Sequence, residues 1–183
     1  MRGRLILHSF SRPIHRAPDF HQGTNSTNPF WSWLSSFLAK PTDEQIACQA
    51  PKPILLDVGL TKPFEWTPYI LPLQIVRVGA LYIVAVPGEF TTMSGRRLKQ
   101  TVLDVLAKNG QLTPDTKVVI AGLANSYSHY VATWEEFQIQ RYEGASTLYG
   151  PHTLDAYRQV RLCLRLCGRA VMGVYSFVLQ VHN

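Results

Sequence analysis

The chain of 183 residues is long enough to form one ordinary domain with a buried core. Its composition, 46% hydrophobic and 16% charged residues, is typical of a globular protein and excludes a wholly disordered chain. No stretch approaches eighteen uninterrupted apolar residues, so the sequence shows no conventional transmembrane helix. Three cysteines are too few and too scattered for a disulfide framework.

The formal net charge of +6 is distributed unevenly along the chain. Residues 1–16 and 158–183 each contain four arginines and no acidic residue, whereas residues 17–157 contain ten basic and twelve acidic residues. A nucleic-acid-binding domain carries its positive charge on the folded surface, interleaved with aromatic residues. The charge pattern therefore argues against a nucleic-acid partner.

The first part of the chain predicts little regular structure. Residues 29–40 have the apolar spacing of a short amphipathic helix. Three prolines within residues 41–53 indicate a linker, and the apolar run at 54–56 is consistent with a short strand.

The middle of the chain gives the clearer pattern. Strands are predicted at 74–79 and 81–86, joined by a tight reversal at Gly79-Ala80, and a third at 117–121. Between them, residues 93–109 predict a long helix with Gly110 as its C-cap, and residues 134–142 predict another helix. The expected buried stripe of the long helix is Met93, Leu98, Val102, Val105 and Leu106. Alternating strands and helices predict an α/β fold, a mixed sheet with flanking helices.

Glu89 is the most informative single position. It follows a buried strand directly, behind Pro87-Gly88, and precedes a helix that Thr91 or Thr92 can cap. The carboxyl ends of strands are where α/β proteins bind ligands, so a carboxylate here is suited to a metal ligand or a general base. The alternative is an acidic residue that complements a helix N-terminus.

A second cluster, residues 125–130, follows the next strand and includes His129 and Tyr130. A tyrosine there can donate a hydrogen bond to a developing oxyanion or ligate a metal as phenolate. Aromatic packing at the rim of the sheet is the alternative. Neither His129 nor His152 has a second histidine at ligand spacing, so the chain shows no complete metal-binding set.

Three long motifs resemble those of the neutral/alkaline ceramidases, in the same order and at similar spacing. They are Ala85-Val86-Pro87-Gly88-Glu89-Phe90-Thr91-Thr92-Met93-Ser94-Gly95-Arg96-Arg97-Leu98, Ala121-Gly122-Leu123-Ala124-Asn125-Ser126-Tyr127-Ser128-His129-Tyr130 and Tyr142-Glu143-Gly144-Ala145-Ser146-Thr147-Leu148-Tyr149-Gly150-Pro151-His152-Thr153-Leu154. The upstream strings at 22–24, 28–31 and 51–56, the last beginning Pro51-Lys52-Pro53, also fit.

The resemblance implies a zinc amidohydrolase that cleaves the N-acyl bond of ceramide to give sphingosine and a fatty acid. The family binds Zn²⁺ through two histidines, a glutamate and a tyrosine. By motif, Glu89 matches the glutamate ligand, Tyr130 matches the tyrosine ligand, and Tyr142 matches a catalytic tyrosine near the substrate amide. Two ligands of one tetrahedral zinc must lie within about 4 Å of each other, so we expect Glu89 and Tyr130 to converge.

The resemblance also implies a missing part. The two zinc histidines of the family belong to an earlier half of a longer chain, and His8, His15 and His21 do not lie in the corresponding motifs. We therefore expect an incomplete fragment: a partial catalytic domain at 17–157 between unmatched basic ends at 1–16 and 158–183. The family is secreted or associated with the plasma membrane, endoplasmic reticulum or Golgi, and this sequence shows no clear signal peptide.

Two alternatives from other classes stay open. One is that the chain is a non-catalytic remnant. The other is that it is a fragment that binds a lipid surface. The second depends on the tail, where Arg158, Arg161, Arg165 and Arg169 fall on one side of a possible helix that could contact a membrane surface. Glycines and β-branched residues weaken that helix.

Overall fold

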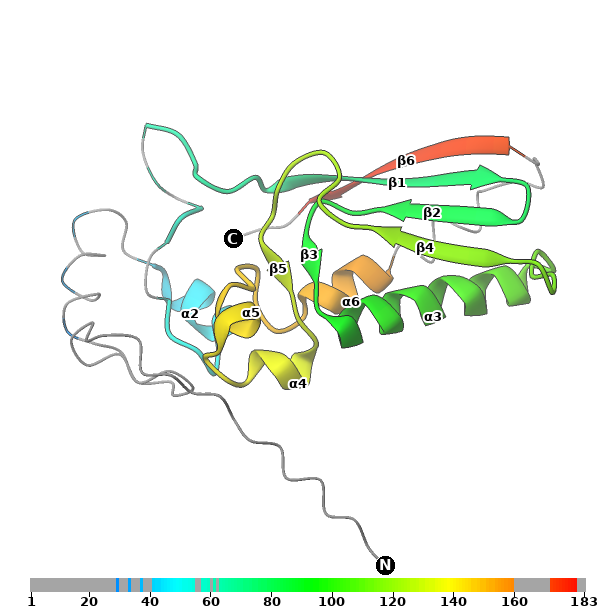
Figure 1. Cartoon of the computed structure of the whole chain (residues 1–183). Coiled ribbons are helices and arrows are strands. Elements are labelled where there is room, and N and C mark those ends of the chain that lie inside the picture. The colour runs from blue at the N-terminus through cyan, green and yellow to red at the C-terminus, as the bar shows by residue number, and fades with distance from the viewer. Residues whose placement is uncertain are drawn as a thin grey trace, which may run out of the picture.

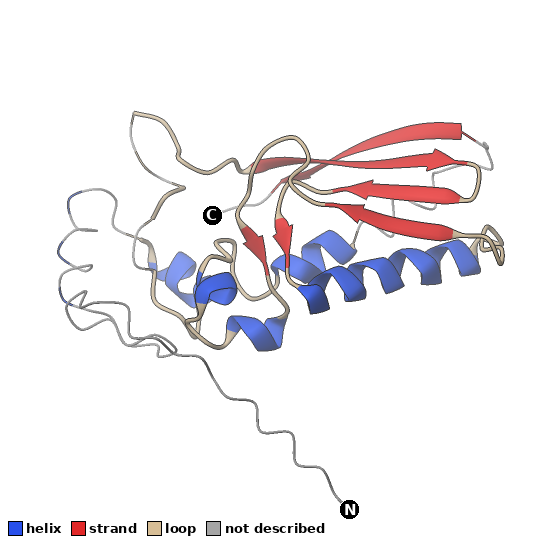
Figure 2. Cartoon of the chain, viewed as in Figure 1, coloured by secondary structure: helices blue, strands red, loops and turns tan. Residues whose placement is uncertain are grey.

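The computed structural model describes residues 41–54, 57–59, 61, 63–159 and 172–180, together with the single positions 29, 33 and 37. In Figures 1 and 2 a sheet lies over helices α3 and α6, and a group of short elements extends from one end of it. The α/β class and the mixed sheet with flanking helices, predicted from the sequence, are both confirmed.

The main sheet has four strands in the order β4-β2-β1-β6. They are β1 (Ile70–Val78), β2 (Leu81–Ala85), β4 (Lys117–Ala121) and β6 (Met172–Gln180). β1 pairs antiparallel with β2 and β6, whereas β2 and β4 run parallel because α3 connects them. The three clear strand predictions are confirmed, although β1 begins four residues before the predicted start at residue 74.

A two-residue turn joins β1 to β2, as Gly79-Ala80 predicts. Val78 pairs with Leu81, and Gly79 has φ of +60°, a backbone conformation that glycine adopts without strain. The turn sets the register of the hairpin and places Tyr82 and Val84 in the core.

Helix α3 (Thr92–Lys108) covers one face of the sheet and supplies much of the core. Leu98, Val102, Val105 and Leu106 are buried, as expected. Met93 is not, with 43% of its surface exposed. Four residues before Leu98 the stripe reaches Ser94, which is fully buried, so the prediction of Met93 was one residue out of register.

Both ends of α3 are capped by the residues that the sequence indicates. The Thr91 hydroxyl accepts a hydrogen bond from the Ser94 amide at 3.1 Å. At the other end Gly110, at φ of +65°, donates to Ala107, and Gln111 donates to Leu106 at 2.8 Å. This pair of bonds is the Schellman motif, and it ends the helix where Gly110 predicts.

The shorter elements form a second group beside the sheet. They are β3 (Glu89–Phe90), β5 (Tyr130–Val131), α4 (Trp134–Phe137), α5 (Tyr142–Ala145) and α6 (Thr153–Arg158). The single helix predicted over 134–142 is wrong, because α4 and α5 are separate. The chain turns back between them so that the backbone of Gly144 packs directly against carbonyls of residues 136 and 139.

Two predictions for the N-terminal part of the described chain, the linker at 41–53 and the strand at 54–56, are not confirmed. The linker predicted at 41–53 contains helix α2 (Asp43–Gln49), which begins with a capping box between Thr42 and Gln45 that the sequence analysis overlooked. Ile54 lies outside any strand, and residues 55 and 56 lie outside the described part of the chain, as does most of the helix predicted at 29–40.

The C-terminal segment adds a strand that the sequence did not predict, after the region of the possible arginine-bearing helix. β6 pairs with β1 along nine residues, from Ile70 opposite Gln180 to Val78 opposite Met172. Residues 160–171 lie outside the described residues. Arg158 ends α6 and donates to Thr101 at 3.0 Å and to Asp155, so it contributes to packing within the domain.

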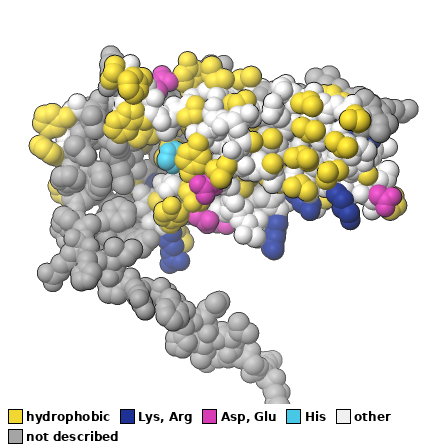
Figure 3. All heavy atoms as spheres, turned by 45° about the horizontal axis from the view of Figure 1, so that its top comes forward, with side chains coloured by type: hydrophobic (Ala, Val, Ile, Leu, Met, Phe, Trp, Pro, Cys, Tyr) yellow, Lys and Arg dark blue, Asp and Glu magenta, His cyan; other side chains and the backbone are white. Residues whose placement is uncertain are grey.

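The sheet face opposite α3 remains exposed and apolar. Alternate residues of the strands point away from the helices, and Figure 3 shows hydrophobic side chains gathered over this face. The exposed apolar side chains on it are Ile70, Val78, Val119, Met172, Val174 and Val178. Within the described residues we find no helix with the length and hydrophobicity needed to cross a bilayer.

Candidate functional site

The two predicted site residues Glu89 and Tyr130 lie on adjacent strands. β3 and β5 form a two-stranded parallel sheet in which Glu89 is the register partner of Tyr130. The Glu89 amide donates to His129 at 2.9 Å, and the Thr91 amide donates to Val131 at 3.1 Å. The two strands therefore present Glu89 and Tyr130 side by side at the end of the main sheet.

Close backbone packing brings the two strands together. A side chain at Gly88 would place its Cβ 3.0 Å from the His129 carbonyl and 3.1 Å from the Ser128 hydroxyl. Ser128 is buried and donates from both its amide and its hydroxyl to the Pro87 carbonyl, at 2.7 and 2.8 Å. The Pro87-Gly88 pair thus allows an approach that larger residues would prevent.

Two tyrosines lie beside the Glu89 carboxylate, and a third packs against one of them. The Tyr127 hydroxyl donates to Glu89 Oε1 at 2.6 Å, and Tyr130 lies close enough to the same carboxylate to lower its pKa. The rings of Tyr142 and Tyr130 meet edge to face with centroids 5.3 Å apart. Glu89, Tyr127, Tyr130 and Tyr142, here named the carboxylate–tyrosine cluster, form one connected group.

Hydrogen bonding changes the acid–base properties of this cluster. The bond from Tyr127, followed by the interaction with Tyr130, lowers the pKa of Glu89. The same interactions raise the pKa of Tyr127 to about 12 and also raise the pKa of Tyr130, since a phenol beside an anion retains its proton. At neutral pH Glu89 is ionised and both phenols are hydrogen-bond donors.

The loop before Tyr130 has an unusual backbone. Among the described residues other than glycine, positive φ occurs only at Leu123, Asn125 and His129, with φ of 58°, 66° and 62°. The His129 ring lies 4.9 Å from the Tyr127 ring between centroids. Left-handed conformations of this kind are costly for such residues and persist where the surroundings enforce them, which is common at functional sites.

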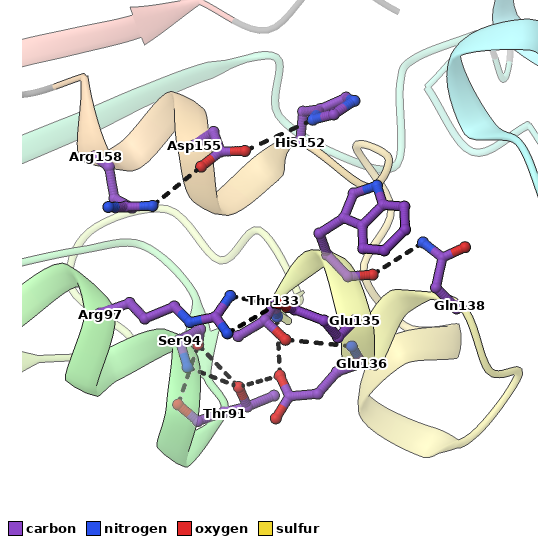
Figure 4. A network of polar contacts seen from close by, with 11 residues as sticks. Thr91, Ser94, Arg97, Thr133, Glu135, Glu136, Gln138, His152, Asp155 and Arg158 are labelled. Carbon is purple, nitrogen blue, oxygen red and sulfur yellow. Dashed lines mark hydrogen bonds and ion pairs between the residues drawn. The ribbon is translucent and has the colours of Figure 1, made fainter.

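A polar network at the starts of α3 and α4 supports strands β3 and β5 (Figure 4). Glu136 Oε2 accepts from the Thr91 hydroxyl at 2.7 Å and from the Thr133 amide at 2.8 Å. The Ser94 hydroxyl donates to Val131 at 2.6 Å. These bonds tie the start of α3 to the start of α4, and so fix β3, which carries Glu89, relative to β5, which carries Tyr130.

This network yields a stability prediction. Glu136→Ala should lower the free energy of unfolding by about 2 kcal/mol, because the partly buried donors Thr91 and Thr133 both lose their acceptor. Glu135→Ala is the matched control on the same helix. Its bidentate contact with Arg97 is solvent-exposed and should contribute less than about 1 kcal/mol. Urea denaturation of both variants measures the difference, and equal losses would contradict this assignment.

Metal binding by these residues is chemically plausible but incomplete. A carboxylate and a phenol are oxygen donors that zinc accepts, and here they stand on register partners of two paired strands. Within the described residues, no group of three or more His, Cys, Asp or Glu side chains could hold a metal ion. The described chain therefore fits part of a zinc site.

The structure places Glu89 and Tyr130 on paired strands and packs Tyr142 against Tyr130. Their roles as metal ligands and catalytic tyrosine stay predictions. Tyr127, which hydrogen-bonds to Glu89 at 2.6 Å, lies in the cluster at 125–130 but was not among the predicted site residues. Tyr127 lies in an irregular loop, whose sequence shows no helix or strand periodicity. Its position within the cluster at 125–130 was therefore the only sequence signal for it.

An ionised carboxylate beside tyrosine hydroxyls, next to strand ends of an α/β fold, offers an oxygen ligand and hydrogen-bond donors of the kind that hydrolytic enzymes use. Comparison with known sequences is more specific. Residues 11–159 match the family described as "Neutral/alkaline non-lysosomal ceramidase, N-terminal". The chain belongs to this family.

Individual relatives agree with that assignment. The chain is 61% identical over 142 residues to neutral ceramidase A of Dictyostelium discoideum and 60% identical over 142 residues to neutral ceramidase 3 of Arabidopsis thaliana. The alignments cover 77% of this chain but only 20% and 19% of those proteins. This chain thus corresponds to about a fifth of the length of its relatives.

A solved structure of neutral ceramidase from Pseudomonas aeruginosa is also similar. It superimposes with a TM-score of 0.64 at 41% sequence identity, covering 80% of this chain and 24% of that protein. A structure titled "Ceramidase complexed with C2" gives the same TM-score at 39% identity. The fold described above is therefore that of one portion of a ceramidase.

Proposed function

We propose that this chain provides part of the active site of a zinc-dependent amidohydrolase that cleaves the N-acyl bond of ceramide to sphingosine and a fatty acid. The observation that carries the proposal is the convergence of Glu89 and Tyr130 on paired strands, with Tyr130 beside the Glu89 carboxylate. Family membership and the names of the relatives support ceramide as the substrate.

In this proposal Glu89 and Tyr130 are two of four zinc ligands, and two histidines come from polypeptide outside this chain. Zinc supplies Lewis-acid chemistry: it polarises a carbonyl group and activates water for attack. Tyr127, which donates to Glu89 Oε1, orients the carboxylate toward the proposed metal. Partners of this kind are as much a part of a metal site as its ligands.

Tyr142 has a different role in the proposal. It is 68% exposed and contacts Tyr130, so its hydroxyl lies at the open side of the carboxylate–tyrosine cluster. A phenol at this position can donate a hydrogen bond to the substrate carbonyl oxygen as negative charge develops on it. Such a donor stabilises the transition state more than the ground state, and that difference accelerates the reaction.

The exposed sheet face supports a contribution from further polypeptide. It carries six exposed apolar side chains on β1, β4 and β6, including Val119 and Met172. Contiguous apolar surface of this kind is typical of an interface with other protein. We propose that the remainder of a ceramidase polypeptide covers it.

A segment exchange tests the proposed function. The matched segment of this chain replaces the corresponding 142 residues of neutral ceramidase A of Dictyostelium discoideum, to which it is 61% identical. We expect the hybrid to hydrolyse a fluorescent ceramide and to bind zinc. We expect the 183-residue chain alone to show no turnover and weak zinc binding, since a catalytic zinc normally needs three protein ligands.

The two arms have different consequences. A folded hybrid without activity would show that this segment does not supply working ceramidase residues. Turnover by the isolated chain would show that the two external histidines are unnecessary, and would contradict the proposed division of the ligands.

A further inference from the structure

Lys52 is a buried lysine that no part of the proposed reaction uses. It lies in the Pro51-Lys52-Pro53 motif, and only 3% of its surface is exposed. In the described part of the chain no carboxylate forms an ion pair with it. Lysine is almost never fully buried without a partner, so the contacts that do hold it indicate its role.

Two contacts hold the Lys52 side chain, and both lie next to the helix that carries Tyr142. Its Nζ donates a hydrogen bond to the carbonyl oxygen of Gly144 in α5. The same Nζ lies 3.6 Å from the centroid of the Phe137 ring, at the end of α4. A cation at the last carbonyls of a helix is also favoured by the helix dipole.

Helix α5 is short and depends on its neighbours for its position. It is only four residues long, and no side chain caps its N-terminus at Arg141. A helix this short is unstable in isolation. Gly144 lies so close to α4 that an added Cβ would be 2.6 Å from the Glu136 carbonyl oxygen. Lys52 and α4 therefore hold α5 at the same residue.

The position of α5 determines the geometry of the carboxylate–tyrosine cluster. Tyr142 is the first residue of α5 and packs against the Tyr130 ring. At the other end, the Ser146 carbonyl accepts from the Tyr130 amide at 3.2 Å. A shift of α5 would therefore move Tyr142 and loosen the backbone of Tyr130 together.

We infer that Lys52 is a positioning residue: through Gly144 it holds helix α5 so that Tyr142 stays against Tyr130 at the edge of the site. The inference rests on the proposed function only in giving Tyr142 a catalytic role. The contact itself can be tested without zinc or ceramide, so its failure and the failure of the proposed function are distinguishable.

The experiment compares the full chain with its Lys52→Met and Lys52→Arg variants by solution NMR. In Lys52→Met, which keeps the length and apolar stem but loses the donor, we expect the Tyr130–Tyr142 ring contact to disappear. Amide exchange in α5 should become roughly tenfold faster relative to α3, as expected for loss of a charge-assisted hydrogen bond. Lys52→Arg, which retains charge and donors, should restore the ring contact at least in part.

Lys99→Met is the matched control, since Lys99 is an exposed lysine on α3 and should change neither signal. An unchanged ring contact and unchanged α5 exchange in folded Lys52→Met would overturn the inference. If that variant does not fold, the unmodified chain still decides the matter. A protected Lys52 ammonium with cross-relaxation to the Phe137 ring supports the inference, and a rapidly exchanging ammonium without it overturns the inference.

Discussion

Replacing Glu89 by glutamine in the active hybrid enzyme is expected to reduce ceramide turnover by more than about a hundredfold. Glutamine has the shape of glutamate and can still accept the hydrogen bond from Tyr127, so the fold should survive. It loses the negative charge that a zinc ligand supplies. Removal of partners outside the ligand set typically costs 10–100-fold in metal affinity or activity, and loss of a ligand should exceed that range.

Two variants calibrate this result. Tyr127→Phe should lower zinc affinity by roughly ten- to a hundredfold, because the carboxylate loses its orienting donor. Glu135→Gln changes an exposed glutamate that pairs with Arg97, and should leave activity and zinc content unchanged. Turnover and bound zinc are measured on the same preparations. Normal activity and zinc content in Glu89→Gln would exclude Glu89 as a ligand.

The regular elements were predictable where a local signal and a tertiary contact agree. The strand at 117–121 has strong strand propensity, and the helix before Gly110 has a cap and an apolar stripe. Both elements are present in the structure. Helix α2 has no buried residues and three prolines around it, so its only sequence signal was the Thr42–Gln45 capping box. The three prolines instead led to the prediction of a linker at 41–53.

The separation of α4 from α5 could not be read from periodicity. At Gly144 the absence of a side chain lets the backbone of α5 pack against α4, and Lys52, 92 residues earlier in the chain, donates a hydrogen bond to the same residue. Likewise, β6 has glycine and serine among its apolar residues, which weakens its strand pattern. It forms a strand by pairing with the edge of β1. Both are long-range contacts that local patterns do not encode.

For the site, the motifs identified Glu89, Tyr130 and Tyr142, but not why they meet. Their convergence depends on the register of β3 with β5 and on the short backbone approach at Gly88. Tyr127 entered through a loop with three left-handed residues, a conformation without a reliable signature outside glycine. Motif comparison thus located the site, and the tertiary structure explained its geometry.

Burial of Lys52 should make the protein more stable as the pH is raised through mildly alkaline values. Burial lowers the pKa of Lys52 from 10.5 to about 8 in the folded chain. Above pH of about 8 the unfolded chain therefore keeps a proton that the folded chain has released, and stability rises with pH wherever the unfolded state binds more protons.

The expected gain between pH of about 8 and 10 is up to about 2 kcal/mol, since each unit of pKa shift corresponds to about 1.4 kcal/mol. Tyr127 and Tyr130, whose pKa values are raised, oppose this trend only as the pH passes about 10. The neutral amine of Lys52 still donates to Gly144, so α5 should remain in place. Urea denaturation across this pH range should show the increase in the unmodified chain and not in Lys52→Met. An equal slope in both proteins would mean that another group is responsible and that the Lys52 ammonium is not desolvated in the folded state.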